Sequence, residues 1–149
     1  MCDEVFPGVW ERVHAALASR SMTVEMGMRG DATLVVTDAD TARSLRSGDV
    51  DVLGTPRLIA LCEEATVAAL EGSLDATTSS VGMRIRVDHL QPTPIGASVT
   101  AEATLEKIDG RRLTFTVSVS DTGGLVAAGK ITRALVDRTR FMGKCCSSS

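Results

Sequence analysis

The stretch of sequence that decides the fold is residues 99–120, which reads VTAEATLEKIDGRRLTFTVSVS. Apolar and polar residues alternate along it on both sides of Asp109-Gly110, a pair typical of tight hairpin turns. The same period of two continues outward over residues 83–89 and, after a Gly-Gly turn, over residues 125–136. Strands with one apolar and one polar face predict an antiparallel sheet that packs one face against another element.

A long helix is predicted at residues 55–71, and it is the only candidate large enough to cover that apolar face. Thr55 is expected to be its N-cap, Pro56 suits its first turn, and Gly72 can end it in a left-handed conformation. A curved antiparallel sheet wrapped around one central helix is the hot-dog arrangement. The predicted fold class is therefore α+β, a hot-dog domain over residues 22–141.

The segments that flank the alternating strands are predicted to be a helix, two short strands and a tail. Residues 1–21 are interpreted as an N-terminal helical extension, with an amphipathic helix over residues 5–19. Residues 22–28 and residues 32–36 are interpreted as strands. The Ser-rich residues 142–149 are expected to be a disordered tail.

Composition and charge exclude several classes of function. The chain has 149 residues, of which 44% are hydrophobic and 23% charged, with a net charge of −3, the balance of an ordinary globular domain. It has no run of basic residues and few aromatic ones, so nucleic acid is not an expected partner. No apolar stretch approaches the roughly 20 residues that span a bilayer, and no positively charged, apolar leader opens the chain. We therefore expect a cytoplasmic protein without a membrane partner.

Ligands for a metal ion are scarce in the sequence. The cysteines lie at Cys2, Cys62, Cys145 and Cys146. Only two histidines, His14 and His89, could supplement them, and the spacing is not that of a zinc site. No metal site and no separate cofactor are expected.

Glu63 has an unusual position on the predicted helix. At about 100° per residue, it falls beside Ile59, Val67 and Leu70, whereas Glu64 falls on the charged face. A carboxylate among apolar neighbours is desolvated, which raises its pKa and makes it a better base. From the residues alone, the alternative is that Glu63 lies at the edge of the apolar face and reaches water.

His89 ends the predicted strand of residues 83–89, and counting by twos puts it on the face that meets the helix. Pro92 and Pro94 follow and are expected to stop the strand. A histidine there titrates near neutral pH and can act as a general acid or base. The alternative is a core histidine with its hydrogen bonds satisfied.

Three blocks of sequence surround these residues. They are residues 82–96, GMRIRVDHLQPTPIG, continuing into VTAEA at 99–103; residues 109–115, DGRRLTF; and LGTP at 53–56 followed by Glu63. Together, and in this relative spacing, they resemble the hot-dog thioesterases related to fluoroacetyl-CoA thioesterase. The resemblance extends over residues 27–140, most of the chain.

The resemblance implies an acyl-CoA thioesterase whose catalytic residues are Thr55, Glu63 and His89, with Gly82 and Arg133 near the substrate. In such a site Glu63 acts as general base, or as a nucleophile that forms a mixed anhydride. His89 orients it and handles protons, and the hydroxyl of Thr55 positions substrate or water. Coenzyme A is part of the substrate, so none is needed as a cofactor.

Two segments depart from the family pattern. The final strand has Lys130-Ile131-Thr132-Arg133 where the family often has Thr-His-Glu-Arg, so only the arginine matches. The polar residues 38–51 are interpreted as a loop or lid with short helical content near residues 42–45. Residues 44–52 contain no Phe, although in the family aromatic residues there shape the fluoroacetyl-specific pocket. Fluoroacetyl-CoA is therefore not the natural substrate we expect.

Spacing along the helix predicts an oligomer. Eight helical residues rise about 12 Å, so Thr55 and Glu63 of one straight helix cannot hydrogen-bond directly. The site closes only if a second chain contributes to it or if the substrate spans the gap. We hypothesise a homodimer, with a tetramer as the alternative, whose site combines residues of two chains. The open edges of a small sheet favour the same arrangement, since pairing between protomers protects them.

Two other functions fit a hot-dog domain. The first is an acyl-CoA dehydratase or hydratase, which usually carries Asp-x-x-x-x-His on the central helix, and residues 55–72 contain no histidine. The second is a non-catalytic acyl-CoA-binding protein in which Glu63 and His89 merely satisfy each other.

Overall fold

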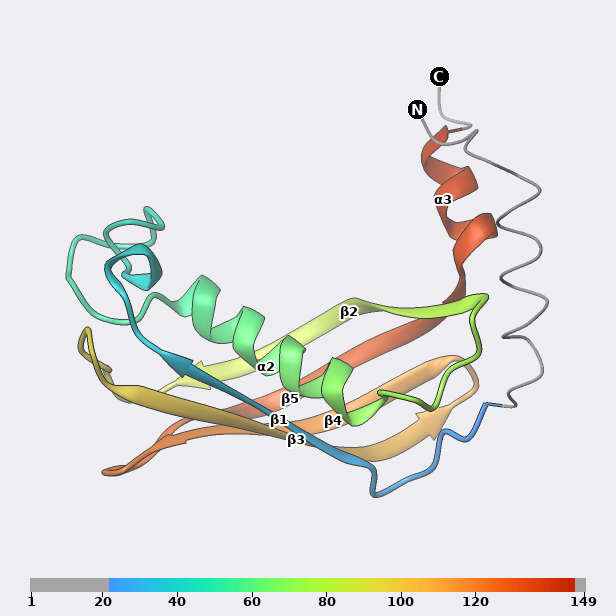
Figure 1. Cartoon of the computed structure of the whole chain (residues 1–149), viewed down its shortest axis with the longest axis horizontal. Helices are drawn as coiled ribbons and strands as arrows, with labels where there is room; N and C mark the ends of the chain where they lie inside the picture. Colours follow the sequence, from blue (N-terminus) through green and yellow to red (C-terminus); the bar gives the residue numbers. More distant parts are fainter. Residues whose placement is uncertain (1–21, 147–149) are drawn as a thin grey trace.

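The computed structural model describes residues 22–146, so the helix expected within residues 5–19 lies outside the described residues. Five antiparallel strands form one sheet in the order β1-β3-β4-β5-β2. They are β1 (Arg29–Val35), β2 (Thr78–His89), β3 (Ser98–Asp109), β4 (Arg112–Asp121) and β5 (Gly124–Asp137). The helix α2 (Thr55–Ala69) crosses the inner face of this curled sheet (Figure 1). The predicted α+β hot-dog architecture is confirmed.

The two predicted hairpin turns connect the strands that form the middle of the sheet. β3 pairs with β4 across Asp109 and Gly110, and Gly110 has a φ of +61°. β4 pairs with β5 across a second turn that ends at Gly124, which has a φ of +125°. Glycine adopts such φ values without the steric penalty of a Cβ atom, so both turns form where the sequence predicts them.

Apolar side chains of β3, β4 and β5 form one core together with those of α2 and of the residues before it. The largest fully buried side chains of this core are Phe115, Leu53, Leu58, Leu61, Leu105, Leu113 and Ile131. Every second side chain of β4 and one face of α2 point into this core, so the sheet has one buried face.

The start of α2 differs from the prediction by one residue. Gly54 is the N-cap, and Thr55 is the first helical residue, followed by Pro56. The hydroxyl of Thr55 therefore does not cap the helix and is available to another partner. At the other end the helix stops at Ala69, earlier than expected, and Gly72 has the predicted left-handed conformation, with a φ of +77°.

The strand expected at residues 22–28 is wrong. These residues form an extended loop with a turn at Gly27, and the single strand β1 begins at Arg29. It includes Gly30, where a Cβ atom would overlap the backbone of Ala65 and Ala69 in α2. Glycine at this position therefore lets β1 pass directly against the helix, which the sequence pattern alone did not indicate.

The lid segment, residues 38–51, is held at both ends. Its helical content lies at η1 (Asp38–Asp40), before the predicted position, because a capping box between Thr37 and Asp40 forms there. Backbone bridges join Thr41 to Leu53 and Val52 to Pro94. The lid is therefore an anchored loop beside the start of α2.

The expected disordered tail is also wrong over residues 142–146, which belong to the helix α3 (Arg138–Cys146). This helix continues directly from β5. No helix among residues 22–146 is long and apolar enough to cross a membrane.

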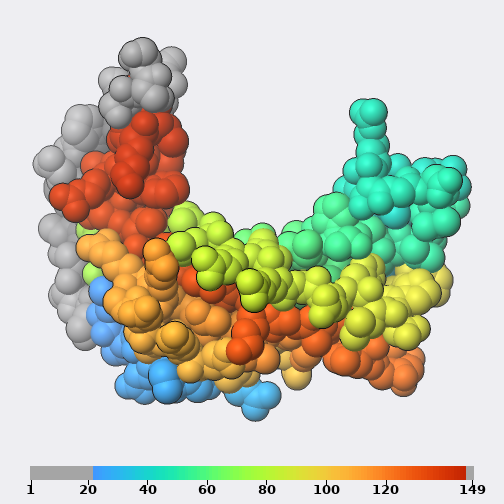
Figure 2. Space-filling model, turned by 180° about the vertical axis from the view of Figure 1, so that it is seen from behind, coloured from blue at the N-terminus to red at the C-terminus, as the bar shows by residue number. Residues whose placement is uncertain are grey.

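The edge strand β2 is left largely uncovered by α2, which packs mainly on β1 and β3. Met83 and Ile85 of this strand are 45% and 39% exposed, and Val67 of α2 is 51% exposed. Figure 2 shows this region as the floor of a hollow between the lid segment and α3, which rise at opposite ends. A bulge between Gly82 and Arg84 interrupts the pairing of β2 with β5.

Candidate active site

Thr55 and His89 meet at the lid end of α2. Oγ1 of Thr55 lies 2.8 Å from Nδ1 of His89, within hydrogen-bonding distance. Thr55 is the first residue of α2 and His89 is the last residue of β2. The predicted inner-face position of His89 is confirmed, since it pairs with the buried Ala127. A hydroxyl bonded to an imidazole is the arrangement in which the ring can take a proton from the hydroxyl.

The surroundings of His89 favour the neutral imidazole. Burial lowers the pKa of His89 from its ordinary value of 6.5, and the backbone of Gln91 partly opposes this shift. Nε2 of the ring is buried and has no hydrogen-bond partner among residues 22–146. One ring nitrogen is therefore held by Thr55, while the other has unused hydrogen-bonding capacity.

A pocket of about 330 Å³ opens beside this pair. Its lining comes from the lid segment, from the start of α2 and from the residues that follow β2. The lining residues are Ala42, Ser47, Gly48, Val50, Val52, Leu53, Thr55, His89, Leu90, Gln91 and Pro92. Thr55 and His89 thus lie in a depression that a small molecule can enter.

Glu63 lies two turns further along α2 and contacts Arg133 of β5. Nη1 of Arg133 lies 3.3 Å from Oε2 of Glu63, and their side chains are 8% and 34% exposed. Val67, which was expected to shield the carboxylate, is itself 51% exposed. The predicted apolar surroundings of Glu63 are therefore wrong, because its polar partner is a buried guanidinium.

Ser80 anchors Arg133. Nε of Arg133 donates to Oγ of Ser80 at 2.9 Å, and Nη2 donates to the carbonyl of Ser80 at 2.9 Å. Burial lowers the pKa of Arg133, while Glu63 opposes that shift, and an arginine remains cationic. Sequence reasoning missed Ser80, because counting by twos from His89 puts it on the outer face, and the bulge between Gly82 and Arg84 brings it to the inner one.

Gly82 makes room for the carboxylate of Glu63. It lies opposite Arg133 in the β2–β5 ladder. A Cβ atom at Gly82 would overlap Oε2 of Glu63. Four residues therefore lie together, and we call them the Glu63–Arg133 cluster: Glu63, Arg133, Ser80 and Gly82.

The structure does not join Thr55 to Glu63. Each has its own partner, His89 for Thr55 and Arg133 for Glu63. The two residues are eight positions apart on one helix, about 12 Å along its axis. Within one chain the five predicted site residues thus form two separate groups, one at the start of α2 and one near its middle.

The neighbours of Glu63 on α2 have ordinary roles. Glu64 is 54% exposed and pairs with Arg57 at 2.9 Å, the solvated position predicted for it. Cys62 is fully buried, and burial raises the pKa of its thiol to about 11, so it is not a reactive nucleophile. No group of three potential metal ligands occurs among the described residues.

Comparisons with known sequences agree with the fold. The family described as fluoroacetyl-CoA-specific thioesterase matches residues 36–139. The fluoroacetyl-CoA thioesterase of Streptantibioticus cattleyicolor is 34% identical over 94 residues, which make up 63% of this chain and 68% of that protein.

Solved structures of thioesterases are also similar to this chain. A structure of the fluoroacetyl-CoA thioesterase FlK has a TM-score of 0.79 and 29% identity, covering 85% of this chain and 98% of FlK. A variant of FlK in complex with fluoroacetate and CoA has a TM-score of 0.74 and 31% identity, covering 79% and 99% of the two chains. A thioesterase superfamily member of Thermus thermophilus shares the fold, with a TM-score of 0.76, 22% identity, and coverage of 82% and 90%.

The fold and these matches define the class of protein, a hot-dog thioester hydrolase. Within that class the chain belongs to the fluoroacetyl-CoA-specific thioesterase family.

Proposed function

We propose that this protein hydrolyses an acyl-CoA thioester, with Thr55, His89 and Glu63 as its catalytic residues. The observation that carries the proposal is the 2.8 Å contact between the Thr55 hydroxyl and the His89 ring at the wall of a pocket. The solved complex of the FlK variant with fluoroacetate and CoA supports coenzyme A as the carrier of the acyl group.

In this reaction water adds to the thioester carbonyl, the C–S bond breaks, and the products are a carboxylic acid and free coenzyme A. Glu63 takes the proton from water, or attacks the carbonyl itself and forms an anhydride that water then opens. His89, neutral near pH 7 because it is buried, takes up a proton released by the attacking water and delivers it to the leaving thiolate. The hydroxyl of Thr55 orients the ring and donates a hydrogen bond to the substrate or water.

The proposed site is completed by a second copy of the chain, in a homodimer. Nε2 of His89 has no partner among the described residues, and only one oxygen of Glu63 is bonded to Arg133. The exposed edge of β2 can pair with β2 of another copy. Antiparallel pairing of two such strands lays the end of one against the start of the other. This pairing brings His89 of one chain toward the Glu63–Arg133 cluster of the second.

Thiol release from purified protein tests the activity. Wild type is expected to release free coenzyme A from acyl-CoA, and Glu63→Gln to lose about 10² to 10⁴ of its kcat, as for removal of a general base. Glu64→Gln is the matched control, since this neighbouring carboxylate is on the exposed face of the same helix. Thioester binding without any turnover by wild type would instead support the acyl-CoA-binding alternative.

Mixing two inactive variants tests the shared site. If Glu63 of one chain acts with His89 of the other, a heterodimer of Glu63→Gln and His89→Asn has one intact site and one doubly altered site. Equal amounts should then recover about a quarter of wild-type activity, because half of the randomly assembled dimers are heterodimers. No recovery after subunit exchange has been verified would place the site within one chain.

A further inference from the structure

The lining and the size of the pocket beside Thr55 and His89 indicate which acyl group the substrate carries. We propose that it receives the acyl chain of the substrate, and that this chain is uncharged, aliphatic and at least about four carbon atoms long. The inference rests on the proposed thioesterase activity and adds the substrate class.

The chemistry of the lining is the first support. Apart from Thr55 and His89, the described residues around this pocket present only Ser47 and Gln91 as polar side chains. None is Asp, Glu, Lys or Arg, so nothing there would neutralise a charged acyl group such as a dicarboxylic one. Burying an unpaired carboxylate against such walls is strongly unfavourable.

The size of the pocket is the second support. Its volume of about 330 Å³ is at the low end of pockets that bind drug-sized ligands, and it greatly exceeds what a two-carbon acyl group fills. The lid side contributes small residues, Ala42 and Gly48, and no Phe, Tyr or Trp lines the described pocket. A Cβ atom on Gly48 would lie 3.5 Å from that of Ala42, so a larger side chain at either position would occupy this space.

Exposed apolar side chains at the pocket are the third support. Val50 and Leu90 both line it, and each is 53% exposed. Covering such surface with an aliphatic chain removes it from water, and each buried methylene is expected to raise kcat/KM about fourfold. A two-carbon acyl group would leave most of this surface exposed.

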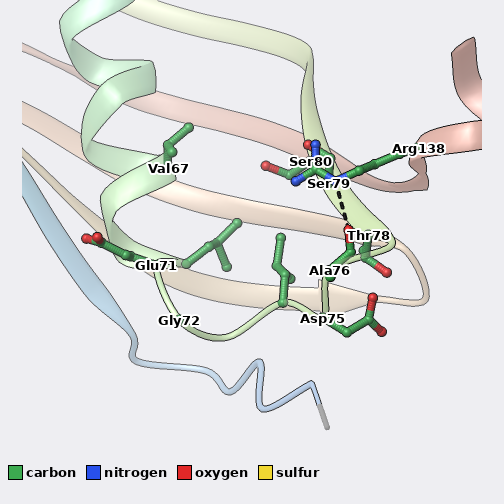
Figure 3. Close-up of a pocket in the computed structure, with 11 residues that line it drawn as sticks. Val67, Glu71, Gly72, Asp75, Ala76, Thr78, Ser79, Ser80 and Arg138 are labelled. Atoms are coloured by element: carbon green, nitrogen blue, oxygen red, sulfur yellow. Dashed lines mark hydrogen bonds between the residues drawn. The ribbon is translucent and has the colours of Figure 1, made fainter. Parts of the chain in front are cut away.

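A second pocket at the other end of α2 has a different character. It has a volume of about 380 Å³ and includes Glu71, Asp75 and Arg138 in its lining (Figure 3). Nε of Arg138 donates to the carbonyl of Ala76 at 3.1 Å, and both residues line this pocket. Because this second pocket carries charges of both signs, it is less suited to an aliphatic chain, and it provides a matched control.

The test is kcat/KM of wild type for acetyl-, fluoroacetyl-, butyryl-, hexanoyl- and succinyl-CoA. We expect butyryl- or hexanoyl-CoA to exceed acetyl-CoA at least tenfold, since two buried methylenes contribute about sixteenfold, and succinyl-CoA to be the poorest. Preference for acetyl- or fluoroacetyl-CoA would overturn the inference and leave the thioesterase activity intact. Hydrolysis of none of the five would instead remove the proposed function itself.

Variants locate the acyl chain. Ala42→Leu fills the pocket and should abolish the preference for longer chains while acetyl-CoA hydrolysis persists. Val50→Phe should also fill the pocket and abolish the preference for longer chains. Because Val50 is half-exposed, the larger side chain does not disturb the core, so this variant replaces Ala42→Leu if Ala42→Leu fails to fold. Ala76→Leu adds the same volume to the charged pocket and should leave the profile unchanged. A loss of long-chain preference in Ala76→Leu alone would assign the acyl chain to that other pocket and refute the proposal.

Discussion

The hydroxyl of Thr55 and the imidazole of His89 lie 2.8 Å apart, joining the first residue of the central helix to the last residue of an edge strand. The contact exists because Gly54 takes the N-cap position. A threonine at the N-cap would have its hydroxyl directed toward the backbone N–H groups of the helix. Here the hydroxyl faces a ring whose other nitrogen is still unpaired within the described chain.

Removing the Thr55 hydroxyl should lower kcat. Thr55→Val keeps the shape of the side chain but removes its hydrogen bond to His89, and we expect a loss of about 10- to 100-fold in kcat. Thr55→Ser keeps the hydroxyl and should retain most of the activity. Steady-state thiol release measures both variants, and equal activity of Thr55→Val and wild type would contradict a role for the hydroxyl.

Acid should inactivate the enzyme at a pH below 6.5. Burial lowers the pKa of His89 from 6.5, so the ring is neutral at pH 7 and gains its proton only in more acidic solution. If the neutral ring is the active form, the acidic limb of kcat/KM, which reports the free enzyme, has its midpoint below 6.5. A midpoint above 6.5 would contradict this assignment.

The lowered pKa of His89 also predicts how the free energy of unfolding depends on pH. The unfolded chain binds the His89 proton at a higher pH than the folded chain, so this group makes the free energy of unfolding decrease as the pH falls below about 6.5. The decrease continues until the pH passes the lower pKa of the folded state. In denaturant titrations, the free energies of unfolding of wild type and His89→Gln should depend differently on pH in this window and run parallel above it.

Arg133 is expected to act through Glu63 and not through the substrate. Arg133→Met removes the cation that holds the carboxylate, and we expect a loss of about tenfold or more in kcat with little change in KM. Ser80→Ala removes one of the two hydrogen bonds that Arg133 donates to Ser80 and should give a smaller loss.

A double-mutant cycle checks this positioning role. Once Glu63 has been changed to Gln, the further change Arg133→Met should cost little activity, because the group that Arg133 positions is already inactive. Fully additive losses would show that Arg133 acts independently, for example by binding the substrate directly.

Two glycines should respond differently to substitution by alanine. In Gly82→Ala the new Cβ overlaps a side-chain oxygen of Glu63, which can move, so activity should fall while stability changes by less than about 1 kcal/mol. In Gly30→Ala the Cβ overlaps the backbone of α2, which cannot yield as easily, so unfolding should become easier by about 1–3 kcal/mol. Chemical denaturation and thiol release on both variants separate the two effects.

The parts of the fold that were predicted from sequence depend on local patterns. The alternation around Asp109-Gly110 placed β3 and β4, and the helical period placed α2, because both patterns report which side chains face the core. The errors occurred where no such pattern exists. Residues 22–28 are apolar enough for a strand, but the turn at Gly27 interrupts them, so Gly27 and Met28 hydrogen-bond to Leu105 of β3 without extending the sheet. Residues 142–146 form a helix although their composition indicates a tail.

The candidate site was predicted only in its parts. The position of His89 on the inner face followed from counting by twos along β2, whereas its bond to Thr55 depends on how the helix and the strand converge. The surroundings of Glu63 were predicted incorrectly, because a helical wheel shows neighbours on the helix and not the guanidinium that reaches it from β5.

The sequence by itself determined the hot-dog fold and the identity of the reactive side chains, because hydrophobic periodicity and residue chemistry are local properties. Only the tertiary structure decided which of those side chains meet. It paired Thr55 with His89 and Glu63 with Arg133, and it placed Ser80 behind the arginine. These contacts join residues 34 to 70 positions apart, and their geometry depends on the curvature of the sheet around the helix, which no local pattern records.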